Sequence, residues 1–149
     1  MILSFNKKFV PLIQSGQKIH TIREDKTGRW KQGMKIHFYE GNLRNGGKPF
    51  EACKRHEADF NDGKSGLGVC TYVQYVKIAL SCGKVIVCID GEYLSDRGVA
   101  IFAQNDGLTM VEFLNWFFPD GKDNVLFMKL IHWTEGGIYN IYPKGDRLP

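Results

Sequence analysis

Residues 14–23 have the sequence Gln-Ser-Gly-Gln-Lys-Ile-His-Thr-Ile-Arg and join a predicted helix to a predicted strand. The preceding residues, Lys7 to Gln14, place their apolar side chains on one helical face, which predicts an amphipathic helix. Gly16 follows as a typical C-terminal helix cap. Ile19 to Arg23 is rich in β-prone residues and predicts a strand immediately afterwards.

Most other predicted elements are strands. In chain order they are Ile2–Phe5, Lys35–Tyr39, Val69–Leu80, Lys84–Ile89, Val125–Trp133 and a short edge strand at Ile138–Tyr142. Two helices are predicted before the last long strand, one over Ser95–Gln104 and one beginning with a capping box of Thr109 and Glu112. The aromatic residues 116–118 of the second helix are expected in the core. Strands with inserted helices predict an α+β domain built on a mixed barrel.

The length and composition indicate one globular domain over residues 1–149. The chain has 43% hydrophobic and 24% charged residues, close to globular averages. Residues 41–68 differ, because they are rich in Gly, Asn, Lys and Asp and contain few apolar side chains. Excursions of this length are usually functional or disordered, so this segment is a candidate for binding a protein partner.

Several classes of protein are disfavoured by the sequence. No apolar run approaches the ~20 residues needed to cross a bilayer, and no signal peptide is evident at Met1. The four cysteines form no Cys-x-x-Cys pair, which favours reduced thiols in a cytoplasmic protein. Cys53 and His56 have the spacing of half a zinc site, but no second half is evident. We therefore expect no metal, no cofactor and no membrane partner, and a monomer is favoured.

Basic residues cluster within a short part of the chain, although the net charge is only +4. The cluster consists of Lys18, Arg23, Lys26, Arg29, Lys31 and Lys35. Two interpretations remain open, a solvated face or a surface that contacts phosphates. Trp30 lies between Arg29 and Lys31, where it either packs in the barrel or stacks on a base whose phosphate the two cations bind.

Three stretches, in order, resemble the signature of ASCH domains: residues 14–23, the basic turn from Arg29 to Lys35, and Phe102-Ala-Gln-Asn-Asp-Gly-Leu at 102–108. Phe127 to Trp133 is similar to the closing strand of that family. ASCH domains are similar to PUA domains. The resemblance therefore implies a PUA-like mixed β-barrel with inserted helices, with a cleft beside the first helix and an RNA, nucleoside or nucleotide ligand.

Some ASCH members are small amidohydrolases that remove the acetyl group of an acetylated cytidine with Lys, Thr and Glu. Lys18 and Thr21 match two of these positions, and Asp106 stands at the third in place of Glu. A Thr hydroxyl needs a neighbouring base, and a desolvated Lys has a pKa low enough to act as one. Alternation on a strand places Arg23 on the same face as Thr21, where it would bind a phosphate or polarise a carbonyl.

Each of these residues also has a purely structural interpretation. Thr21 is a β-prone strand residue, Lys18 a solvated charge near a helix end, and Asp106 a turn residue before Gly107. Three functions remain open. The first is binding of RNA or a modified nucleoside in a cleft formed by Lys18, Thr21, Arg23 and Asp106. The second is amide hydrolysis in the same cleft with Thr21 as nucleophile and Lys18 as base. The third is a protein–protein adaptor acting through residues 41–68.

Overall fold

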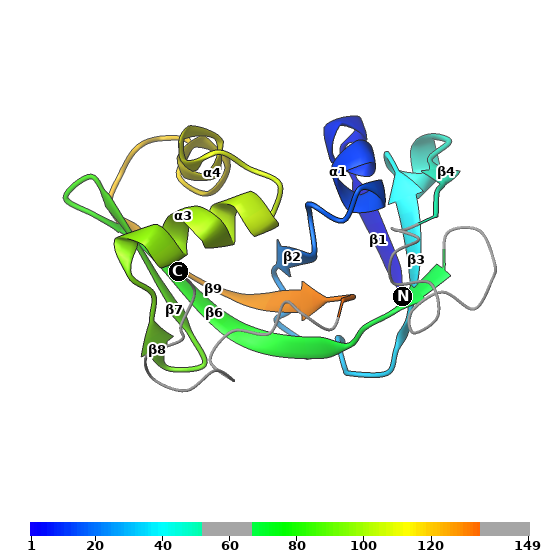
Figure 1. The fold of residues 1–149 in the computed structure, drawn as a ribbon, viewed down its shortest axis with the longest axis horizontal. Coiled ribbons are helices and arrows are strands. Elements are labelled where there is room, and N and C mark those ends of the chain that lie inside the picture. The colour runs from blue at the N-terminus through cyan, green and yellow to red at the C-terminus, as the bar shows by residue number, and fades with distance from the viewer. Residues whose placement is uncertain (52–66, 135–149) are drawn as a thin grey trace.

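The structure, a computed structural model, describes residues 1–51 and 67–134 of the chain. Its elements are shown in Figure 1. In chain order they are β1 (Ile2–Phe5), η1 (Lys7–Phe9), α1 (Val10–Gln14), β2 (His20–Arg23), β3 (Lys35–Glu40), η2 (Leu43–Asn45), β4 (Lys48–Pro49), β5 (Leu67–Val69), β6 (Tyr72–Ser81), β7 (Lys84–Ile89), β8 (Glu92–Tyr93), α3 (Asp96–Asn105), α4 (Met110–Phe117) and β9 (Asn124–His132).

The strands form two sheets, and the α+β class expected from the sequence is confirmed. In the first sheet the order is β1-β3-β4, with β5 also paired to β3; β1 runs parallel to β3. The second sheet has the order β2-β9-β6-β7-β8, and all its pairs are antiparallel. Among the described residues neither sheet closes on itself, and no pairing joins the edge strands β1 and β2.

The chain passes from the first sheet to the second at Cys70. Its amide donates to the Met34 carbonyl and its carbonyl accepts from the Gly33 amide, each at 2.8 Å. The next amide, that of Thr71, donates to the carbonyl of His132 on β9 at 2.9 Å. The sequence predicts one strand over Val69–Leu80, but the structure has two strands, β5 and β6, separated at this crossing.

The first predicted helix, Lys7–Gln14, is divided into η1 and α1. Pro11 has no amide hydrogen to donate to the Lys7 carbonyl, and the Val10 amide takes that carbonyl in a tighter 3₁₀ turn instead. Gly16 ends the helix with a φ of +77°, as the cap signal predicts. Within residues 1–51 and 67–134, no helix has the length and apolar character needed to cross a bilayer.

Helices α3 and α4 lie on one side of the second sheet (Figure 1). The capping box of Thr109 and Glu112 is formed, as predicted. Phe113 and Phe118 are buried against the sheet, but Trp116 is 52% exposed, so the expectation that all three aromatic residues of 116–118 are core is wrong for Trp116. Trp116 is only partly covered, because its ring makes an edge-to-face contact with that of Phe9 in η1, with ring centroids 5.6 Å apart.

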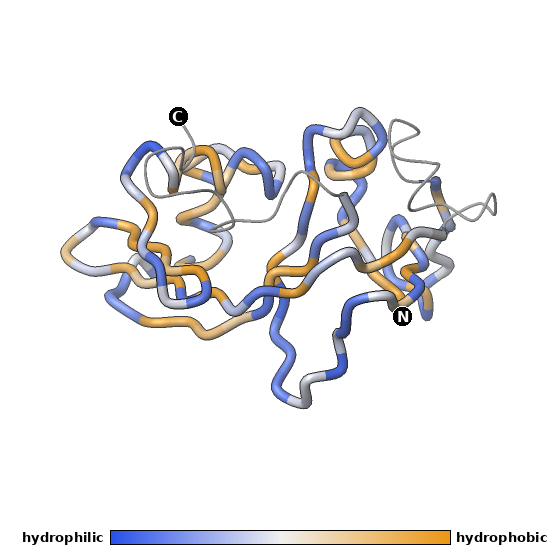
Figure 2. Tube along the Cα trace, turned by 60° about the horizontal axis from the view of Figure 1, so that its bottom comes forward, coloured by the Kyte–Doolittle hydropathy of each residue, from blue (hydrophilic) through white to orange (hydrophobic). Residues whose placement is uncertain are grey.

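The loop over residues 24–34 connects the two sheets by way of β2 and β3. It is largely hydrophilic and projects away from the sheets (Figure 2). The predicted edge strand at Ile138–Tyr142 and residues 52–66 of the excursion lie outside the described residues, so the adaptor hypothesis is not addressed by the fold.

The end of α3 packs tightly against the first helix at Gly107. Its φ is +79°, in the left-handed region that favours glycine. A Cβ at this position would lie 3.1 Å from Leu12 Cδ1, 3.2 Å from Phe9 Cδ1 and 3.3 Å from Lys18 Cδ. Glycine therefore permits both the turn and the close approach of Asp106 to Lys18.

We expect Gly107→Ala to lower the free energy of unfolding by about 1–3 kcal/mol, because it adds both backbone strain and steric crowding. Urea denaturation measures the change. Gly121→Ala is the matched control, since Gly121 also has a positive φ (+65°) but no atom within 4 Å of the added Cβ. Equal destabilisation by the two variants would show that packing at Gly107 contributes nothing.

Candidate functional site

A buried ion pair joins Lys18, which lies between α1 and β2, to Asp106 at the end of α3. The Lys18 ammonium donates to Asp106 Oδ1 at 2.6 Å and to the Asp106 carbonyl at 2.5 Å. Lys18 is 2% exposed and Asp106 5% exposed. The backbone reinforces the contact, because the Ile19 amide donates to the Asn105 carbonyl at 3.0 Å. The structure thus brings together two of the three predicted catalytic residues and contradicts the interpretation of Lys18 as a solvated charge.

Burial and mutual charge change the pKa values of both members of this pair. Desolvation lowers the pKa of the Lys18 amine below its usual value, although Asp106 acts in the opposite direction. Burial alone would raise the pKa of Asp106, but the Lys18 charge and the neighbouring His20 outweigh it and the pKa is lowered. An amine with a lowered pKa beside a carboxylate can accept and release a proton.

A row of buried polar side chains, not predicted from the sequence, continues from this pair into the second sheet. His20 Nδ1 lies 3.5 Å from Asp106 Oδ1, and the His20 and His132 rings are 5.5 Å apart. His132 Nε2 is 3.0 Å from Gln74 Oε1. Burial lowers the pKa of His20 and lowers that of His132 to about 2, so His132 is neutral. Strand alternation was the sequence signal that could have predicted the burial of His20, because it places His20 on the same face as the buried Ile22.

Thr21, the predicted nucleophile, forms no hydrogen bond with the pair among the described residues. It is 4% exposed and pairs with Ile131 of β9. Because side chains alternate on β2, Thr21 points away from the face on which His20 meets Asp106. The structure thus brings Lys18 and Asp106 together, and a cleft that also includes Thr21 and Arg23 stays a prediction.

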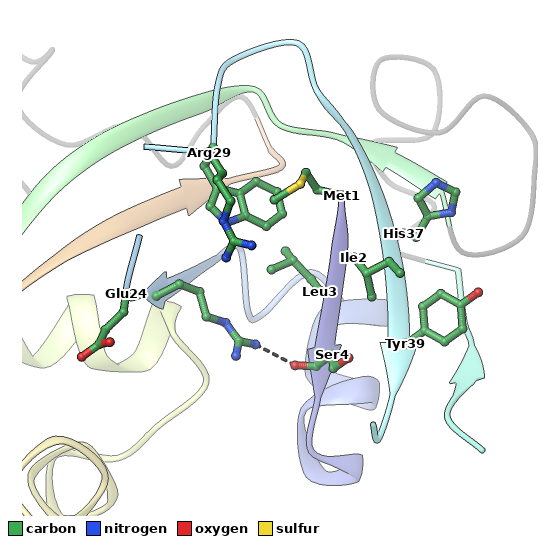
Figure 3. A pocket seen from close by; sticks show the side chains of 10 residues that line it. Met1, Ile2, Leu3, Ser4, Glu24, Arg29, His37 and Tyr39 are labelled. Atoms are coloured by element: carbon green, nitrogen blue, oxygen red, sulfur yellow. Dashed lines mark hydrogen bonds between the residues drawn. The ribbon is translucent and has the colours of Figure 1, made fainter. Parts of the chain in front are cut away.

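A pocket of about 820 Å³ lies instead at the seam between β1 and β2, where the two sheets are not paired. We call it the seam pocket. The Arg23 guanidinium spans the seam and donates through Nη2 to the Ser4 carbonyl at 2.7 Å, drawn as a dashed line in Figure 3. The pocket is lined by Met1, Ile2, Leu3, Ser4, Arg23, Glu24, Arg29, Trp30, His37 and Tyr39.

The carboxylate of Asp25 fixes the loop that carries Arg29 and Trp30. Its two oxygens accept hydrogen bonds from the Arg29 amide at 2.9 Å and the Trp30 amide at 3.0 Å. Burial alone would raise the pKa of Asp25, but these two amides outweigh it and the pKa is lowered. Figure 3 shows the Arg29 side chain pointing into the space between β1 and β2. The role of Asp25 was not predicted either, although Asp25-Lys-Thr-Gly is a recognisable turn sequence.

The predicted ligand-binding residues differ in their placement. Arg23, Arg29 and Trp30 line the seam pocket, whereas Lys31 is exposed outside its lining. Trp30 is 7% exposed, so it packs into the protein and forms part of the pocket wall, rather than standing exposed between two cations. The expectation of an exposed stacking surface at Trp30 is therefore wrong.

The seam pocket and the buried pair are neighbours through Phe5. Arg23 Cζ lies 5.3 Å from the centre of the Phe5 ring, and Lys18 Nζ lies 5.9 Å from the same centre. The Arg23 charge also contributes to lowering the pKa of Lys18. An anion bound at Arg23 would offset that effect on Lys18.

No group of three or more His, Cys, Asp or Glu side chains suitable for a metal is found within residues 1–51 and 67–134. Cys53 and His56, the half zinc site considered from the sequence, lie outside the described residues. Cys70 is buried, and burial raises the pKa of its thiol to about 11, which makes it unreactive near neutral pH.

Comparison of the chain with protein-family models, with curated proteins and with solved structures finds no match. The resemblance to ASCH domains thus remains an expectation from sequence motifs.

We expect Asp106→Asn to destabilise the protein by about 3–5 kcal/mol near pH 7, because it leaves the Lys18 ammonium buried without a counter-charge. The Lys18 pKa then falls further, so the folded state loses this proton at a pH where the unfolded state, with a pKa near ~10.4, still holds it. The free energy of unfolding of the variant should therefore rise from pH 7 to pH 9 more steeply than in the wild type, by at most ~1.4 kcal/mol per pH unit.

Urea denaturation at several pH values tests this, with Lys18→Met/Asp106→Asn as the control. The double variant has no buried amine to titrate and should lose the additional pH dependence. If Asp106→Asn and the double variant showed the same pH dependence, the Lys18–Asp106 pair would not control stability.

Proposed function

We propose that this chain is a PUA-like domain of the ASCH type that binds RNA or a nucleoside phosphate in the seam pocket. The observation that carries the proposal is the convergence of Arg23 and Arg29 on one pocket with an aromatic wall. Two guanidinium groups suit a phosphate because each presents donors in a planar fork. A crossing strand that connects two otherwise open sheets is compatible with a PUA-like barrel opened along the seam.

The donors in the pocket are partly uncommitted. Arg23 Nε has no hydrogen-bond partner among the described residues, although it is inaccessible to solvent. The Arg29 side chain is 66% exposed, and its Nε lies 3.8 Å from Asp25 Oδ1. Trp30 and Tyr39 supply apolar contact for a base or sugar, and the Glu24 carboxylate can accept a hydrogen bond from a ribose hydroxyl or a base amine. This mixture favours a mononucleotide unit over a polyphosphate.

We expect cytidine monophosphate to bind more tightly than cytidine, because only the former carries the phosphate. Arg29→Ala should weaken binding of the monophosphate about tenfold, as expected for loss of a charge-assisted contact worth ~1.4 kcal/mol, and should leave cytidine binding nearly unchanged. Isothermal titration calorimetry measures both ligands.

Lys31→Ala is the matched control. Lys31 is an exposed cation two residues from Arg29 that does not line the pocket. If Lys31→Ala weakened binding as much as Arg29→Ala, general positive charge rather than the pocket would explain the affinity. Equal affinity for cytidine and cytidine monophosphate would show that the pocket does not bind the phosphate.

Amide hydrolysis of an acetylated cytidine is the second candidate, and the lowered pKa of Lys18 favours it. In this reaction a nucleophilic oxygen attacks the acetyl carbonyl while Lys18 accepts its proton; that proton passes to the departing exocyclic amine, and water releases acetate. Lys18 and Asp106 have the properties of a base and its supporting carboxylate. The nucleophile would be Thr21 only if its hydroxyl turned toward the pair; otherwise it would be water.

For this candidate we expect Lys18→Met to abolish the release of cytidine from acetylated cytidine. Chromatography of the reaction mixture measures the cytidine released. Thr21→Val preserves the shape of the side chain and removes the hydroxyl, so it should also abolish turnover if Thr21 is the nucleophile. Retained turnover in Thr21→Val would identify water as the nucleophile. Asp106→Glu should raise a weak activity if the longer carboxylate of the active relatives is needed. Absence of turnover in every form would leave binding as the function.

A further inference from the structure

The face of the second sheet opposite α3 and α4 carries three large exposed aromatic side chains. Phe127 on β9 is 77% exposed, Tyr75 on β6 is 68% exposed and Tyr93 on β8 is 60% exposed. Figure 1 shows both helices on the other side of this sheet. Side-chain alternation explains the arrangement, since the neighbours of these residues, such as Val76, point into the core.

Lysines alternate with these rings because of the strand register. Tyr75 pairs with Lys129 and Lys77 pairs with Phe127, so these two aromatic residues each lie beside a cation on the neighbouring strand. Lys129 Nζ lies 3.1 Å from the centre of the Tyr75 ring. Lys77 Nζ lies 5.4 Å from the centre of the Tyr93 ring and donates to its hydroxyl at 3.2 Å. The rings of Tyr75 and Tyr93 thus each contact an ammonium group.

These five residues, Tyr75, Lys77, Tyr93, Phe127 and Lys129, are called the aromatic platform. A hollow of about 430 Å³ lies over four of them, and its lining also includes Lys26, Asp90 and Gly91. The Asp90 carboxylate already accepts hydrogen bonds from Gln74 Nε2 at 2.8 Å and the Tyr75 amide at 2.9 Å. Asp25, the other acidic residue of the hollow, is occupied by the Arg29 and Trp30 amides. The three lysines of the lining outnumber its two carboxylates, so the net charge of the hollow is positive.

We propose that the aromatic platform binds single-stranded nucleic acid, with bases stacked on Phe127 and Tyr75 and phosphates contacted by Lys77 and Lys129. Every base has a flat π-face that stacks on an aromatic ring, while a single strand presents a phosphate beside each base. The alternation of ring and ammonium across the strands matches this alternation of base and phosphate. A duplex does not fit, because its bases are already stacked and paired.

The composition of the platform distinguishes this ligand from an apolar protein partner. A protein-binding surface is expected to be depleted of lysine at its centre, since burying an ammonium without a counter-charge is costly. Here Lys77 and Lys129 are central rather than peripheral. Phosphates supply the missing counter-charge, and the aromatic rings gain the burial that they lack in the free protein.

The platform is independent of the seam pocket, although both border the same loop. Glu24 and Arg29 line the seam pocket, whereas Asp25 and Lys26 line the hollow. The proposal for the platform therefore goes beyond the proposed function, and it is tested by substituting residues that do not line the seam pocket.

The test measures fluorescence anisotropy of the full chain with labelled single strands of about 12 nucleotides, one of uridine and one of deoxythymidine, since such surfaces cover ~4–16 nucleotides. Phe127→Leu and Tyr75→Leu keep apolar volume but remove the ring, and each should weaken binding about tenfold, as expected for one lost stack. Lys77→Gln should reduce the slope of log affinity against log salt by about 0.7.

Two controls separate stacking on the platform from general apolar contact and from binding in the seam pocket. Val111→Ala removes an equally exposed apolar side chain, 72% exposed on α4, and should leave binding unchanged. Phe127→Leu should leave the binding of cytidine monophosphate unchanged, because Phe127 does not line the seam pocket. The platform is overturned if Phe127→Leu and Tyr75→Leu bind the strands as wild type does, or if no strand binds at low salt. In either case the titration with cytidine monophosphate still tests binding in the seam pocket separately.

Discussion

The pairing of the Lys18 ammonium with Asp106 constrains much of the structure. A fully buried amine is tolerated only beside a counter-charge, so the connection between α1 and β2 has to meet the end of α3. Three adjacent features satisfy this requirement: the Ile19 amide bonds to Asn105, Asp106 presents both a carboxylate and a carbonyl, and Gly107 has no Cβ to separate the helices. The contact anchors α3 over the inner face of the second sheet and sets β2 at its edge.

In the described part of the chain, two strand edges, those of β1 and β2, are unpaired with each other where the sheets approach. Exposed edge strands carry unpaired carbonyl and amide groups, which usually need to be covered or charged. Arg23 covers this edge by donating to the Ser4 carbonyl, and its side chain also lines the seam pocket. The pocket therefore arises from a structural requirement of the seam, which explains why one arginine serves both the fold and the candidate site.

Local signals in the sequence predicted most of the elements, because caps, turns and alternation act over a few residues. The Thr109 capping box, the Gly16 cap and the Asp90-Gly91 turn, with φ of 48° and 88°, all occur as expected. Long-range features were not predictable in the same way. The break at Cys70 depends on hydrogen bonds to Met34 and His132, far away in the chain. Burial of Trp30 depends on Asp25, and the position of Thr21 depends on which face of β2 meets α3.

The loop over residues 24–30 relates the two candidate surfaces to one another. The Asp25 carboxylate accepts hydrogen bonds from the Arg29 and Trp30 amides within this loop, in which Arg29 lines the seam pocket and Lys26 lines the hollow over the platform. On these two proposals, a free nucleoside phosphate would contact one surface at a time, whereas a strand that passes the loop would contact both. Binding at the first surface raises the effective concentration of the strand at the second, and even two weak contacts then give substantial affinity. A low affinity for mononucleotides is thus compatible with firm binding of a single strand, and the ratio between the two affinities reports how far the surfaces act together.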